Sequence, residues 1–184
     1  RGSKIPESTF TKALDVIGEG LASNDARIFA ACAHVIIENT VWAPPRGGGE
    51  TSSILREIGI KAIAVAASKR RELFSVLKRG DSYFHQPQRL SLNLLHIILK
   101  KELPSEVLDE TASGVNELMP RIVDGMLRGE ANCSALIASY LDYRPEKSSG
   151  FIRLFRKEYQ ALDPQFSAPI LFPFFPYTDH SDLK

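Results

Sequence analysis

The stretch QPQRLSLNLLHIILKK, residues 86–101, decides the fold expected for this chain. It is the most apolar run of the sequence, and Pro87 stands in what would be the first helical turn, where the missing N–H has no partner to lose. An earlier stretch, Asp25–Asn39, resembles it in composition. Two such apolar helices in one chain predict an all-α domain of stacked helices.

Apolar residues at helical spacing predict further helices along the chain. The expected helices span residues 6–22, 25–41, 51–67, 69–79, 87–101, 103–119, 121–128, 131–141 and 149–162. The basic run at 69–71 cannot share one exposed face of a straight helix, because each residue turns the helix by about 100°. A break is therefore expected at Ser68, and a single long helix from Thr51 to Arg79 is the alternative.

The helix expected at Asp25–Val41 is apolar almost all round, which is typical of a helix packed on two sides. His34 lies in it, and His96 lies in the later apolar helix. A metalloprotease helix needs a second histidine one turn away, and neither position has one. Both are therefore expected to be hydrogen-bonded imidazoles of the core.

Three parts of the chain differ in composition. Residues 1–4 are expected to be a tag remnant or a disordered start, and residues 5–162 a single all-helical domain. Residues 163–184 contain four prolines among aromatic side chains, so an extended tail is expected there. The tail either crosses a groove of its own domain or docks on a partner. The glycine-rich loop at 42–49 lacks the Lys-Ser/Thr of a phosphate loop and is expected to be a plain connector.

No motif for catalysis, a metal ion or a cofactor stands out in the sequence, so none of these sites is predicted. Cys32 and Cys133 lie among apolar residues without a paired spacing, which indicates reduced thiols in an intracellular protein, cytoplasmic or nuclear. No apolar run reaches the roughly 18 residues of a membrane span. An enzyme with an unrecognised site, for example a thiol activated by a histidine, stays an alternative.

Charge is distributed unevenly although the net charge is only +1. Residues 51–101 carry ten Lys/Arg against three Asp/Glu, and residues 102–145 carry three against eight. We call the following set the basic ridge: Arg56, Lys61, Lys69, Arg70, Arg71, Lys78, Arg79 and Arg89. It could bind an acidic or extended segment of a protein partner, or nucleic acid or anionic lipid. It could also pair with the acidic segment of its own chain or remain solvated.

The two apolar helices match each other at an offset of 62 residues, with Arg27 opposite Arg89 and His34 opposite His96. This pattern resembles the inner, mostly buried helix of armadillo and HEAT-type repeats, over about residues 5–142. Such repeats are about 40–47 residues long, so the glycine-rich loop would be an insertion. The resemblance implies stacked antiparallel helices in an irregular armadillo/HEAT-like arrangement. It also implies a non-enzymatic interaction module or scaffold, part of a larger protein, which would bind its partner through the basic ridge.

Overall fold

The computed structural model describes residues 7–41, 60–79 and 84–160, and the regular secondary structure there is entirely helical. The all-α prediction is confirmed for this part of the chain. Its helices are α1 (Glu7–Leu21), α2 (Ala26–Val41), a helical segment at 60–68, α4 (Arg70–Lys78), α5 (Gln86–Leu99), α6 (Ser105–Glu117), α7 (Met119–Leu127), α8 (Ala131–Tyr143), the 3-10 turn η1 (Pro145–Lys147) and α9 (Ser148–Tyr159). The glycine-rich loop and the tail at 163–184 lie outside the described residues.

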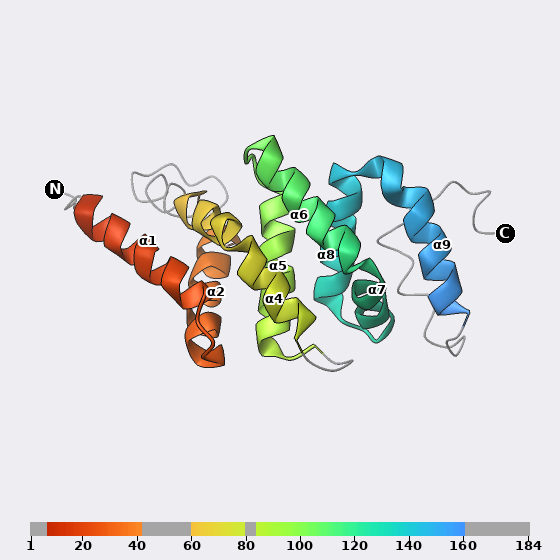
Figure 1. Cartoon of the computed structure of the whole chain (residues 1–184), viewed down its shortest axis with the longest axis horizontal. Helices are drawn as coiled ribbons and strands as arrows, with labels where there is room; N and C mark the ends of the chain where they lie inside the picture. The colour runs from red at the N-terminus through yellow and green to blue at the C-terminus, as the bar shows by residue number, and fades with distance from the viewer. Residues whose placement is uncertain (1–6, 42–59, 80–83, 161–184) are drawn as a thin grey trace.

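Helix α5 is the centre of the arrangement. It packs against α2 on one side and α8 on the other, and it also contacts α4 and α6. Figure 1 shows α2, α5 and α8 in one row, with α1, α4 and α6 in a second row beside them. Because neighbours surround α5, its residues Leu92, Leu95 and Ile98 are fully buried. The helix predicted from the most apolar stretch is therefore the core of the domain.

Helices α5 and α8 run parallel, side by side. Three side-chain contacts join them in ascending order along both helices: Arg89 to Glu130 (2.6 Å), His96 to Ser139 (2.6 Å) and Lys100 to Asp142 (2.5 Å). The His96 Nδ1 atom also lies 3.0 Å from the carbonyl oxygen of Ala135. Burial lowers the pKa of His96, which favours the neutral ring at neutral pH. The prediction of a hydrogen-bonded imidazole is confirmed for His96, which is half-buried between the two helices.

Helices α4 and α6 repeat this parallel pairing in the other row. Arg70 pairs with Glu110, Lys78 pairs with Glu117, and the Phe74 ring lies against Gly114 between the two pairs. Contacts between α4 and α6 join residues 39 or 40 apart in sequence, and those between α5 and α8 join residues 39 to 43 apart. The sequence separation between contacting residues of neighbouring helices is thus nearly the same in both rows.

Local sequence explains two helix ends. The three basic residues at 69–71 do end one helix and begin another, although the turn falls at Lys69 rather than Ser68. A single long helix reaching Arg79 is therefore wrong. Helix α7 ends where Gly129 takes a positive φ of 89°, a conformation open to glycine. The next N–H, of Glu130, then bonds to the carbonyl of Gly125 at 3.0 Å.

Helix α2 is more exposed than its composition predicts. His34 is exposed, and so are Ile28 and Val35, so the expectation of a core histidine at position 34 is wrong. The helix buries Phe29, Ala33 and Ile36 against its neighbours. It is the first of its row in the part of the chain that the structure describes.

Candidate functional site

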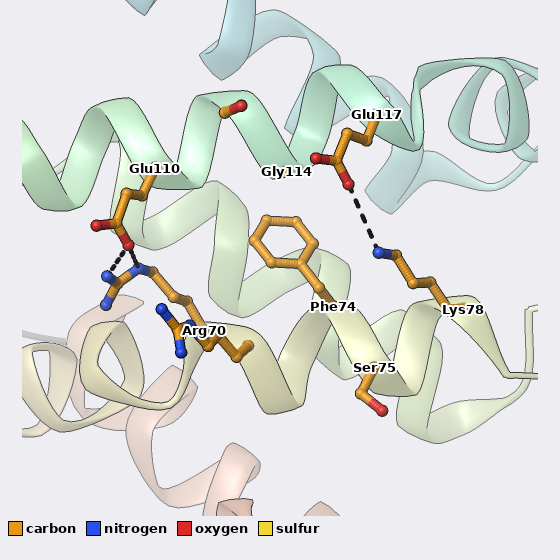
Figure 2. Close-up of a pocket in the computed structure, with 9 residues that line it drawn as sticks. Arg70, Phe74, Ser75, Lys78, Glu110, Gly114 and Glu117 are labelled. Carbon is orange, nitrogen blue, oxygen red and sulfur yellow. Dashed lines mark hydrogen bonds and ion pairs between the residues drawn. The ribbon is translucent and has the colours of Figure 1, made fainter.

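A groove of about 400 Å³ lies between α4 and α6. Figure 2 shows its two walls, each formed by one helix. The side of α4 contributes Arg70, Arg71, Phe74, Ser75 and Lys78, and the side of α6 contributes Glu110, Ser113, Gly114 and Glu117. We call this the α4–α6 groove. It is the place where three residues of the basic ridge come together.

The floor of the groove is the ring of Phe74, which is largely buried. A Cβ atom at residue 114 would lie 2.5 Å from two carbons of this ring. The ring can therefore lie against the α6 backbone only because residue 114 is glycine. This close approach gives the groove an apolar base between its charged ends (Figure 2).

An ion pair bridges the groove at each end. At one end Arg70 donates from Nε to Glu110 Oε2 at 3.0 Å, and its side chain is only 18% exposed. The hydrogen bond from Arg70, and next its positive charge, lower the pKa of Glu110. At the other end Lys78 Nζ lies 3.5 Å from Glu117 Oε2, with both side chains exposed. Exposed pairs of this kind contribute about 0.2–1 kcal/mol, so the second bridge opens at little cost.

The remaining residues of the basic ridge lie on other surfaces. Lys61 stands over the Phe10 ring of α1 at 5.1 Å, and Lys69 lies at the turn before α4. Arg79 donates to Asn24 at 3.2 Å. Two further positions complete the set: Arg89, which pairs with Glu130 of α8, and Arg56, which lies outside the described residues. The described residues of the ridge are thus divided among several surfaces, and Arg70, Arg71 and Lys78 of α4 share the groove.

The acidic segment at 102–145 supplies the partners of several ridge residues. Arg70, Lys78 and Arg89 pair with carboxylates of α6 and of the residue before α8. Pairing within the chain, one of the possibilities left open by the sequence, is therefore confirmed for these three. Arg71 is exposed at the rim of the groove.

A second hollow, of about 460 Å³, lies beside η1 and the start of α9, and sequence patterns gave no sign of it. Its lining includes Met119, Pro120, Phe151 and Leu154, with the Tyr140 hydroxyl donating to Asn116 at 2.9 Å. Its lining also contains Ser149 and the charged residues Glu146, Lys147 and Arg153, so it is a surface hollow of mixed polar and apolar character.

Within the described residues, no cluster of His, Cys, Asp or Glu has the makings of a metal site. Nor is any of the helices in these residues long and apolar enough to cross a membrane. Neither of the two thiols has a pKa lowered toward the thiolate form. Burial raises the pKa of Cys32, and burial together with neighbouring carboxylates raises that of Cys133 to about 12.

We expect Cys133 in a Cys32→Ser variant to react with iodoacetamide at neutral pH only as the protein unfolds. The reason is that the thiolate is the reacting species, and Cys133 is both fully buried and protonated at this pH. A mass-spectrometric time course with and without urea measures the rate. Fast modification of the native protein would contradict the structure and revive the alternative of a reactive thiol.

Comparisons of this chain with protein-family models, with curated proteins and with solved structures find no match. Its function has to be inferred from the residues and the geometry described above. The α4–α6 groove combines a hollow, charged side chains and an apolar floor.

Proposed function

We propose that this chain is a non-enzymatic helical scaffold module, with its helices stacked in an armadillo/HEAT-like array. In this proposal it holds an acidic, extended segment of a partner protein in the α4–α6 groove. The observation that carries the proposal is the groove itself, where Arg70, Arg71 and Lys78 surround the Phe74 floor. Cations beside an aromatic floor suit a segment that presents carboxylates and an apolar side chain.

The arrangement of the helices supports an array of repeats. Neighbours within a row run parallel and contact each other at separations of 39 to 43 residues. Armadillo and HEAT repeats have lengths of about 40–47 residues. Arrays of this type use their extended surfaces to hold peptide segments. The longer offset of 62 between α2 and α5 includes residues 42–59, which lie outside the described residues.

Binding would proceed by exchange of carboxylates. An acidic side chain of the partner takes the place of Glu117 on Lys78, whose present pair is exposed. A second acidic side chain meets Arg71 at the rim. The cost of opening an exposed pair is small, and the partner's carboxylates restore the contacts that are lost. An apolar side chain of the partner then covers the Phe74 ring, and Ser75 and Ser113 offer hydroxyls to its backbone.

Nucleic acid is the less suitable occupant of this groove. Two carboxylates, Glu110 and Glu117, line the same hollow and repel a phosphate backbone. The cations are fewer than the row of contacts that phosphate-dominated binding uses. A partner segment with spaced carboxylates can avoid Glu110 while meeting Arg71 and Lys78.

The double variant Arg71→Glu/Lys78→Glu is expected to weaken binding of a fluorescein-labelled peptide of alternating glutamate and leucine. We expect a loss of about tenfold, since two exposed ion pairs of about 0.2–1 kcal/mol each are lost and like charges replace them. Fluorescence anisotropy measures the affinity. Both side chains are exposed, so the thermal midpoint should change little. Arg70 is left in place because its mostly buried guanidinium also donates to the Ala67 carbonyl.

The matched control is Arg153→Glu/Arg156→Glu, which reverses two exposed charges on α9, away from the groove. It should bind the peptide nearly as the unchanged protein does. Equal losses in the two double variants would show that only net charge matters and would oppose the proposal. A duplex oligonucleotide that binds where the peptide does not, with an affinity falling steeply as salt rises, would favour nucleic acid instead.

A further inference from the structure

Exposed large hydrophobic side chains gather on one flank of the α1–α2 hairpin. In the described residues, four such side chains are exposed: Val16 (63%), Ile28 (50%), Val35 (45%) and Ile60 (57%). Three of the four belong to α1 and α2. Isolated exposed apolar residues are ordinary, whereas a contiguous group of them marks an interaction surface.

Packing between α1 and α2 places these three side chains together. A Cβ atom at Gly20 would lie 2.1 Å from Cys32 Sγ and 3.5 Å from Ile28 Cγ2. The side of α1 that carries Gly20 therefore faces the side of α2 that carries Ile28 and Cys32. Val16 lies one turn before Gly20 on α1, and Val35 lies two turns after Ile28 on α2. We call Val16, Ile28, Ala31 and Val35 the α1–α2 flank.

The other end of the helix array has a different surface. Helix α9 buries Phe151, Ile152 and Phe155 and exposes Arg153 and Arg156. A stacked array ends in a polar outer face, which is what α9 provides. The α1–α2 flank has the apolar character of a contact between neighbouring helices instead. Head-to-tail stacking of copies would place this apolar flank on the charged face of α9, so the flank suits a second copy of itself better.

We propose that the α1–α2 flank is a homodimer interface in which α2 pairs antiparallel with α2 of a second copy. The twofold axis passes close to Ala31, whose small side chain is exposed and lets the two helices approach. About this axis, Ile28 of each copy faces Val35 of the other. Such an interface uses the same patch twice and closes on itself.

Charges at the two ends of α2 match this pairing. Arg27 stands at the start of the helix with an almost fully exposed side chain, and Glu38 is exposed near its end. In the antiparallel pairing, Arg27 of one copy lies next to Glu38 of the other, on both sides of the axis. The apolar centre is therefore flanked by two pairs of opposite charge, which favours this orientation over a parallel one.

Sedimentation velocity over a range of concentrations tests the proposal on the full chain. The unchanged protein is expected to dimerise, and Ile28→Glu or Val35→Glu is expected to leave it monomeric while the helical circular dichroism is retained. Ile60→Glu is the matched control, because it makes the same kind of change at a similarly exposed isoleucine outside α1 and α2. A monomer at every concentration, or a dimer that persists in both flank variants, would overturn the proposal.

A charge exchange tests the antiparallel register. Arg27→Glu and Glu38→Arg are each expected to raise the dissociation constant of the dimer by about tenfold, since each brings like charges together at both ends. The double variant Arg27→Glu/Glu38→Arg restores opposite charges and should dimerise nearly as well as the unchanged protein. If the losses of the two single variants add in the double variant, the pairing proposed here is wrong.

Discussion

A Gly125→Ala variant is expected to lose about 3 kcal/mol or more of its unfolding free energy. The added Cβ would lie 2.3 Å from a ring carbon of Phe84 and 2.8 Å from the sulfur of Cys133. All three residues are buried, and Arg121 covers the Phe84 ring at 5.4 Å, so the ring has little room to move away. Alanine favours a helix by only about 1 kcal/mol over glycine, which is too little to offset the overlap.

Urea denaturation followed by circular dichroism measures this loss. Gly150→Ala is the control, because this glycine also lies in a helix, α9, and a Cβ there would meet nothing within 4 Å. The control should be as stable as the unchanged protein or gain up to about 1 kcal/mol. Replacing Phe84 by leucine in the Gly125→Ala background should recover part of the loss. Equal stability of the two alanine variants would show that the α7–α8 packing described here is wrong.

Helix positions could be predicted from the sequence because they depend on local residues. Seven of the ten residues at 90–99 are apolar, and the structure buries most of this run in the centre of the domain. Proline at 104 and at 120, and glycine at 129, stand where α6 and α7 begin and end. The basic run at 69–71 placed the break before α4 to within one residue.

Contacts between distant segments could not be predicted in the same way. Periodicity shows which side of a helix is apolar, but it does not identify the helix that covers that side. Pairing of Arg70 with the acidic segment of its own chain was therefore only one of several possibilities, and its partner Glu110, 40 residues away, could not be identified before the structure. His34 was predicted to be buried for the same reason, because periodicity does not show whether a neighbouring helix covers it. Its helix is as apolar as a central one, yet its outer flank is exposed.

The groove was also invisible in the sequence, because its two walls come from different helices. The basic residues that form the α4 wall could be identified in the sequence. The floor could not, because it requires Phe74 to lie against Gly114 of another helix. A glycine inside a predicted helix was the available signal, since such a residue often marks a close contact between helices. The register that brings residue 74 to residue 114 follows from the packing of both rows and not from either helix alone.

A Leu95→Ala variant is expected to lose about 3–5 kcal/mol of unfolding free energy, which for a domain of this size is a large part of the total. Leu95 is fully buried in the middle of α5, the helix with neighbours on both sides of its row and in the other row. The surrounding helices cannot collapse into the cavity without giving up their own contacts. The urea unfolding curve should therefore remain a single transition with its midpoint at a lower urea concentration.

Leu14→Ala removes the same atoms from α1, at a partly buried position in the first hairpin. We expect it to lose only about 1 kcal/mol, since less apolar surface is buried there and one neighbouring helix can adjust. In a stacked array each helix is stabilised by its immediate neighbours. A cavity in the end hairpin therefore weakens contacts only there, whereas a cavity in α5 weakens contacts with helices on both sides. Equal losses at Leu14 and Leu95 would contradict the central position of α5, on which the parallel register of both rows depends.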